Sequence, residues 1–133
     1  MVTKMIFDEK KHLLHYDEMD NLHQEFVEIY NSLETYTAES YKNVLVKLFD
    51  QTKKHFYFEE ILMDKYKYPR KREHQEEHNK VLAEMEYFIQ KSDSRMGQML
   101  IKSYYQEKLP DWFDLHLISM DSDLSGFLKD FKI

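Results

Sequence analysis

The stretch HFYFEEILMDKYKYPRKREHQEEH, residues 55–78, decides the fold. It contains two pairs of metal-ligand types, His55 with Glu59 and His74 with His78, and the members of each pair are four residues apart. On an α-helix this spacing places both side chains on one face. The proline in the intervening tract KYPRKR, residues 67–72, disfavours helical geometry at the residue before it. The stretch therefore predicts two antiparallel helices, each presenting one pair of ligands.

The composition favours a single helical domain. The chain has 133 residues with only two glycines and two prolines, and no segment shows the sustained apolar and polar alternation of a strand. This length is sufficient for one domain with its own core. We therefore expect an all-α fold, an up-down-up-down four-helix bundle with an N-terminal arm and a short C-terminal helix.

Apolar periodicity sets the expected boundaries within one domain over residues 1–133. Apolar residues recur every three or four positions after an arm over residues 1–16. The expected helices span about 17–35, 40–65, 70–91 and 98–120, followed by a short helix over about 122–131. Ser40 is the expected cap of the second helix. Pro110 falls inside the fourth helix and predicts a kink or a new helix start there.

Charge and cysteine content narrow the classes of function. The formal net charge is −6 with histidine neutral, which argues against general nucleic-acid binding because that needs a basic surface. The chain has no cysteine, so disulfides and thiolate metal sites are excluded. The N-terminal segment lacks the apolar core of a signal peptide, and no run of about 18 apolar residues is present to cross a membrane. We expect a cytoplasmic protein that binds neither nucleic acid nor membrane.

Five histidines and two carboxylates fall on the inward faces of the four expected helices. They are His23, His55, Glu59, His74, His78, His116 and Asp121. A core tolerates such groups only when each is paired or hydrogen-bonded, and a metal centre would satisfy all of them together. A single His-x-x-x-His pair is a weak signal, so the prediction depends on the convergence of all seven. Asp121 follows His116 by five residues rather than four, and we expect it where the fourth helix ends.

Three nearby polar residues are expected to lie outside this site. His12 and His15 belong to the arm, where a lone histidine is more often a surface residue than a ligand. Glu60 adjoins Glu59 but is expected to point to another helical face.

The ligand types favour two metal ions. Five imidazoles and two carboxylates exceed the needs of one ion, and helix-bundle cores are where two-metal carboxylate sites are built. The chain's only Glu-x-x-His motif, Glu9 to His12, lies in the arm, so the site is a histidine-rich variant. Imidazole suits iron, zinc and copper. With few anionic donors, such a site favours holding O2 over cleaving it.

These residues resemble the hemerythrin family, and within it the single-domain bacteriohemerythrins, over essentially the whole chain. The most specific part is residues 55–78, where His-Phe-x-x-Glu-Glu is followed by a Met, a Tyr and His-x-x-x-His. MDNLHQEF, residues 19–26, is similar to the family's first-helix motif. WFDLHLISMD, residues 112–121, is similar to its closing motif.

The resemblance implies an O2-binding protein with a non-haem di-iron centre. One iron would be bound by His74, His78 and His116, the other by His23 and His55, and both would be bridged by Glu59, Asp121 and an oxo or hydroxo group. In the family, O2 binds end-on as hydroperoxide at the iron with two histidines. The implied role is reversible O2 carriage, storage or delivery rather than catalysis, although a peroxidase-like side activity is compatible with it. The sequence identifies no protein partner.

Large apolar residues at matching positions would line the O2 pocket. They are Phe26, Phe56, Trp112, Phe113 and Leu117. An ordinary core explains them equally well. Phe113 stands where the family usually has Leu, which predicts a tighter pocket and slower ligand exchange. Other departures are His15 and Tyr16, where Gly and an aliphatic residue are usual, and Leu22 in place of a common Gln.

Three other functions stay open at this point. The same di-iron site could reduce peroxide or nitric oxide as a redox enzyme, which turnover of peroxide would reveal. It could sense O2 or redox state through a partner protein. Zinc could simply fill the histidine site of a structural bundle, and metal analysis would separate that case.

Overall fold

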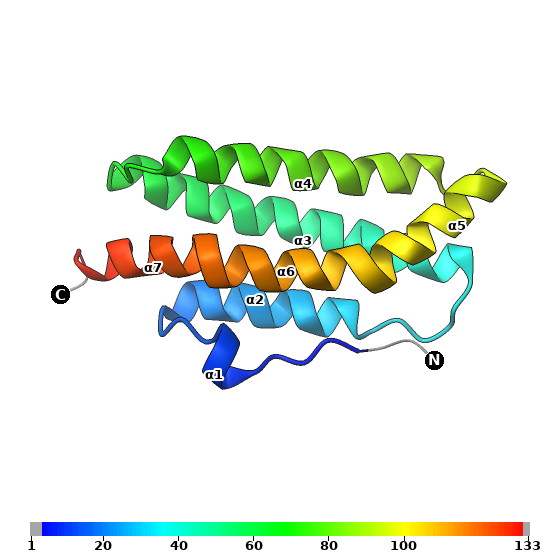
Figure 1. The fold of residues 1–133 in the computed structure, drawn as a ribbon, viewed down its shortest axis with the longest axis horizontal. Coiled ribbons are helices and arrows are strands. Elements are labelled where there is room, and N and C mark those ends of the chain that lie inside the picture. The colour runs from blue at the N-terminus through cyan, green and yellow to red at the C-terminus, as the bar shows by residue number, and fades with distance from the viewer. Residues whose placement is uncertain (1–3, 132–133) are drawn as a thin grey trace.

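A computed structural model describes residues 4–131 of the chain. Every regular element in that range is helical, and the range contains no strand. The long elements α2 (Asp17–Tyr30), α3 (Ala38–Lys65) and α4 (Lys71–Lys91) lie beside a C-terminal helical run over residues 95–129 (Figure 1). The protein is therefore all-helical, as expected, and the arrangement is compatible with a four-helix bundle.

The C-terminal run is helical without interruption. Its parts are α5 (Arg95–Ser103), η1 (Tyr104–Lys108), α6 (Leu109–His116), η2 (Leu117–Asp121) and α7 (Ser122–Lys129). The segments η1 and η2 are π-helical, so their backbone hydrogen bonds reach one residue further than in an α-helix. The expected short terminal helix is present as α7, but no loop separates it from the rest of the run.

Side-chain caps place two helix starts earlier than expected. Thr37 Oγ1 accepts a hydrogen bond from the Ser40 N–H at 3.1 Å, so Thr37 rather than Ser40 caps α3. Ser94 Oγ accepts from the Gly97 N–H at 2.9 Å and starts α5 at Arg95. Both caps satisfy backbone donors that the first helical turn leaves without a partner.

The end of α2 also differs from the expected one near residue 35. The Asn31 side chain exchanges two hydrogen bonds with the backbone of Met5, at 2.8 and 2.7 Å. This attachment to the arm ends α2 at Tyr30. Pro110 stands at the start of α6, directly after η1. The backbone passes from π to α geometry there, so helical structure continues through the proline.

The arm runs beside α2 (Figure 1), and side chains of the arm bond to Asp114 of α6. It contains α1 (Glu9–His12), a single turn that the sequence did not predict. His12 is only 3% exposed, so the expectation that it lies at the surface is wrong. Its Nδ1 accepts from the Asp8 N–H at 2.9 Å, and its Nε2 lies 2.7 Å from Asp114 Oδ1. His15 is exposed, as expected.

Paired tyrosines fill the interior near η1. The Tyr30 hydroxyl donates to the Tyr105 carbonyl at 2.7 Å, the Tyr105 hydroxyl donates to the Tyr30 carbonyl, and the two rings stack 4.3 Å apart. Burial, and then the nearby Tyr41, raises the pKa of Tyr30 to about 12. The two hydroxyls therefore stay protonated and bonded at ordinary pH. We call this group the tyrosine clasp.

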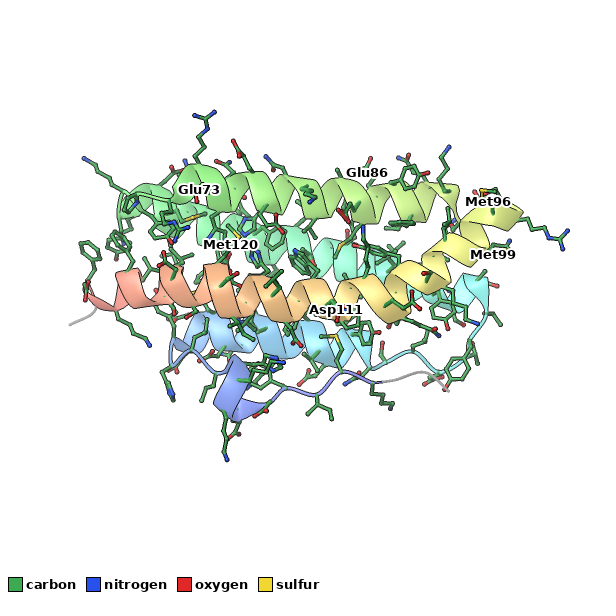
Figure 2. The ribbon with its side chains drawn as sticks, viewed as in Figure 1. Glu73, Glu86, Met96, Met99, Asp111 and Met120 are labelled. Atoms are coloured by element: carbon green, nitrogen blue, oxygen red, sulfur yellow. The ribbon has the colours of Figure 1, made fainter. Side chains whose placement is uncertain are left out.

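The outer surface is mixed in character. Glu73 and Glu86 are exposed on α4, and Met96 and Met99 are exposed on α5 at one end of the molecule (Figure 2). Among the described residues, no helix has both the length and the apolar character needed to cross a membrane.

Candidate metal centre

The seven predicted ligands lie together in the interior, in the half of the molecule next to the loop between α3 and α4. Each is at most 4% exposed. They come from every long helical segment: His23 from α2, His55 and Glu59 from α3, His74 and His78 from α4, His116 from α6 and Asp121 from η2. The four segments therefore each contribute to one buried polar cluster.

The ligand atoms form two groups that overlap. One group contains Glu59, His74, His78, His116 and Asp121, and the other contains His23, His55, Glu59 and Asp121. Within each group the atoms lie within 4.8 Å of one another, close enough to hold a metal ion. Both carboxylates belong to both groups. One group thus offers three histidines and the other offers two.

Glu59 divides its two oxygens between the groups. Its Oε1 lies 3.1 Å from the Nε2 atoms of both His74 and His78, and its Oε2 lies 2.6 Å from His55 Nε2. The same nitrogen of each ring is therefore turned toward the carboxylate. Glu59 lies on α3, one turn after His55, and faces His74 and His78 on α4, so one side chain can serve both groups.

Asp121 divides its oxygens in the same way. Its Oδ1 lies 3.1 Å from His74 Nε2 and 3.2 Å from His116 Nε2, and its Oδ2 lies 2.8 Å from His23 Nε2. Ligand atoms held about 2.1 Å from one ion lie roughly 3 Å from each other. The spacing of the cluster is thus the spacing of atoms that share a metal ion.

Several of these buried atoms lack a hydrogen-bond partner. Within residues 4–131, His78 Nε2, His116 Nε2 and Asp121 Oδ1 form no hydrogen bond, although they face other ligand atoms at 3.1–3.2 Å. A buried polar atom without a partner costs about 1–3 kcal/mol. A cation between these atoms would remove that cost, so the donor set fits a metal ion.

The charges of the cluster also suit a cation. Burial opposes ionisation of Glu59 and Asp121, but the surrounding imidazoles hold the pKa of both carboxyl groups well below their usual range. Burial likewise opposes a charged His74, but the Asp121 and Glu59 carboxylates raise its pKa to about 9. The same carboxylates, Glu59 first, raise the pKa of His55 against the effect of its burial. Without a metal ion, a proton on His74 supplies positive charge beside the two carboxylates.

The π segment η2 explains how Asp121 joins the cluster. A five-residue spacing takes a side chain off the face of an α-helix, and we expected the helix to end there. In η2 the backbone hydrogen bonds span five residues, so His116 and Asp121 lie on one face. The expectation of a helix end at Asp121 is wrong, because α7 continues directly from it.

Glu60 supports one ligand without belonging to either group of ligand atoms. Its Oε2 lies 3.1 Å from His78 Nδ1, the nitrogen that does not face Glu59, a contact that the sequence did not predict. A carboxylate at Nδ1 holds the proton on that nitrogen and leaves Nε2 free to bind a metal. The doublet Glu59-Glu60 was the available signal, but helical periodicity does not reveal how far a long side chain reaches across to α4.

A small cavity adjoins the two-histidine group. It has a volume of about 10 Å3, which is roughly the space of one water-sized sphere. Its lining comprises His23, Phe26, Thr52, His55, Trp112, Phe113, His116, Leu117 and Asp121. Four of the five predicted pocket residues are among them. Phe56 is not, because its ring stacks on His78 with 3.7 Å between centroids. Thr52 was not predicted, since the apolar pattern gives no weight to a hydroxyl.

No protein-family model matches the chain, and no curated protein matches it. A function for this chain therefore has to be inferred from the residues of the cluster and its cavity.

Proposed function

We propose that the chain is a member of the hemerythrin family that binds O2 reversibly at a non-haem di-iron centre. The observation that carries the proposal is the way in which Glu59 and Asp121 each direct one oxygen to the three-histidine group and the other to the two-histidine group. Such carboxylates would bridge two ions, with an oxo or hydroxo group beside them. The ion with two histidines would then have fewer protein ligands than the other.

The position of the cavity supports O2 as the ligand. Two iron ions would supply the electrons and the open coordination position that O2 binding requires. The cavity is lined by His23 and His55 and also by the aromatic rings of Phe26, Trp112 and Phe113. A space of this size admits a ligand of one or two heavy atoms and excludes larger substrates. Its apolar side favours a neutral diatomic molecule over water.

The residues around the cluster keep it closed and ordered. The Phe113 ring packs on Phe26 at 4.8 Å and on the buried arm residue His12 at 5.8 Å. These contacts cover the cavity with apolar groups and limit the entry of water and protons. Glu60 fixes the orientation of His78. The titratable side chains that line the pocket, His23, His55, His116 and Asp121, would all be engaged as metal ligands. Such a pocket suits binding better than turnover, so we propose an O2 carrier, store or delivery protein rather than an enzyme.

The fold is consistent with the same family. We propose that the helical segments form an up-down-up-down four-helix bundle. The backbone of His15 has φ 60°, in the left-handed region that favours glycine, and this is a position where the family usually has Gly. The cytoplasmic location and the absence of nucleic-acid and membrane partners stay predictions from the sequence.

Gas-exchange spectroscopy tests the proposal. The iron-loaded protein is reduced without air, its iron is counted, and its absorption spectrum is recorded under argon, under O2 and again under argon. We expect two iron ions per chain and a visible band that appears with O2 and fades on its removal. Irreversible conversion to the oxidised form would favour a redox enzyme or sensor. No iron and no band would contradict the proposal outright.

A further inference from the structure

Thr52 is a buried polar residue that does not belong to the candidate metal-ligand groups. It lies on α3 one turn before His55, is 1% exposed, and lines the cavity. Its Oγ1 has no hydrogen-bond partner within residues 4–131. A threonine inside a helix usually bonds its hydroxyl to a backbone carbonyl of the preceding turn. Here that bond is absent, and the unpaired hydroxyl destabilises the folded chain.

Three other polar side chains around the cavity, those of Trp112, His23 and His55, each have a polar partner. Trp112 Nε1 donates to Glu77 Oε1 at 3.1 Å. The Nε2 atoms of His23 and His55 face the carboxylates at 2.8 and 2.6 Å. Within the described part of the chain, His116 Nε2 and Asp121 Oδ1 also lack a hydrogen-bond partner, but they are ligand atoms that face each other at 3.2 Å and would be occupied by a metal ion. The Nδ1 atoms of His23 and His116 are unpaired there as well, and the remaining walls are aromatic or aliphatic. Among the described residues that line the cavity, Thr52 alone carries a hydroxyl, and it is free to donate.

We propose that the Thr52 hydroxyl donates a hydrogen bond to a one- or two-atom ligand that carries negative charge in this cavity. The inference rests on the proposed function, because a metal ion at the two-histidine group would hold the other end of the ligand. O2 acquires such charge when it takes electrons from the metal centre. Thr52 therefore sets how tightly the charged ligand is retained, whereas the aromatic walls set only its size.

Two variants separate the hydroxyl from the shape of the side chain. Thr52→Val keeps the shape and removes the donor, while Thr52→Ser keeps the donor and removes a methyl group. The probe is cyanide, a two-atom anion, titrated into the oxidised iron-loaded protein. A hydrogen bond to a charged group corresponds to roughly 10- to 100-fold in affinity. We expect Thr52→Val to weaken cyanide binding by about that factor and Thr52→Ser to stay within about threefold of wild type.

Infrared spectroscopy gives a readout that does not depend on affinity. The stretching frequency of bound cyanide reports a hydrogen bond at its nitrogen, so it should shift in Thr52→Val and not in Thr52→Ser. Iron content should be equal in all three proteins. Loss of iron in Thr52→Val alone would mean that the hydroxyl supports the protein ligands instead, and would overturn the inference.

Melting of the metal-free chain checks the premise. Because the hydroxyl is unpaired, Thr52→Val should raise the melting temperature by about 3 °C. A lower melting temperature would show that the hydroxyl has a structural partner, which also overturns the inference.

The two proposals can fail separately. Reversible O2 binding together with unchanged cyanide affinity in Thr52→Val would leave the proposed function in place and overturn the role of Thr52. Cyanide binding that depends on Thr52, in a protein that does not bind O2 reversibly, would uphold Thr52 and reject O2 carriage. An iron-loaded wild-type protein that binds no cyanide would overturn the inference.

Discussion

The two π segments of the C-terminal run differ in what happens to the polar groups around them. Near η1, the Tyr30 and Tyr105 hydroxyls each donate to the other residue's carbonyl, so the tyrosine clasp is complete within the chain. At η2, Asp121 Oδ1 and the neighbouring His116 Nε2 have no hydrogen-bond partner among the described residues. The backbone is π-helical in both places. Unpaired buried atoms, rather than the irregular helix, therefore distinguish the end of the core that holds the candidate metal centre.

Asp121→Asn should have the largest effect on iron content, because it removes a negative charge from the cluster around η2, where buried atoms lack partners among the described residues. Asp121 faces His23, His74 and His116, and a neutral amide at this position would no longer balance two cations. We expect the iron content to fall from two ions per chain to one or none, as counted after loading and gel filtration. A variant that keeps two ions per chain would contradict the role given to Asp121.

The pH dependence of the stability of the metal-free chain tests the charges of the buried cluster around η2. The pKa values of Glu59 and Asp121 are lowered by folding. Their contribution to the free energy of unfolding is therefore present above about pH 4 and is lost as the pH falls. The pKa of His74 is raised to about 9, so its contribution is complete below about pH 6.5 and is lost as the pH rises through 9. Urea unfolding should therefore give the greatest stability between about pH 4.5 and 6.5.

The iron-loaded protein provides the control for this profile. Metal ions replace the protons on the imidazoles, so stability should persist above pH 7 and fall only in acid, where protons compete with the metal. Chelation should lower the melting temperature at pH 7.5. A metal-free chain that becomes more stable between pH 6.5 and 9 would be incompatible with the cluster as described.

Glu60→Gln is expected to have a smaller effect at the same end. The amide can still meet His78 Nδ1, but it no longer favours the tautomer that leaves Nε2 free. We expect metal affinity to drop by about 10-fold without a change in the number of ions at saturation. Competition with a chromophoric chelator measures this. Gln75→Glu is not a suitable control because Gln75 donates to Glu60, so the exposed Glu73→Gln serves instead.

Tyr105→Phe should have the smallest effect, and that effect should be confined to the tyrosine clasp near η1. It removes one buried hydroxyl donor and leaves the Tyr30 carbonyl without it, at a cost of about 1–2 kcal/mol in the free energy of unfolding. Iron content and the spectrum with O2 should match wild type. Loss of iron in this variant would mean that the two ends are coupled, and the contrast between η1 and η2 would no longer hold.

Helical periodicity was sufficient to predict most of the residues of the buried cluster. The four-residue spacing of His55 with Glu59 and of His74 with His78 fixes their faces in any α-helix, and the structure brings both pairs together. His23 followed from its place beside the apolar stripe. These residues could be predicted because their geometry is local to one regular helix.

The features that the sequence did not reveal depend on an irregular backbone or on tertiary structure. Asp121 was predicted as a ligand, but the π segment that places it on one face with His116 was not. Glu60 reaches His78 across a helix pair, and His12 is buried by a bond to Asp114, far away in the chain. Thr52 is notable only because its hydroxyl has no partner. Contacts of this kind become visible only when the elements are placed in space.

The central claim is that Glu59 and Asp121 lie between two metal ions with unequal histidine ligation. A crystal structure of the iron-loaded protein with anomalous scattering at the iron edge tests this most directly. We predict two iron peaks about 3.5–4 Å apart, one beside His74, His78 and His116 and the other beside His23 and His55. A single peak, or iron bound away from the two carboxylates, would contradict the account.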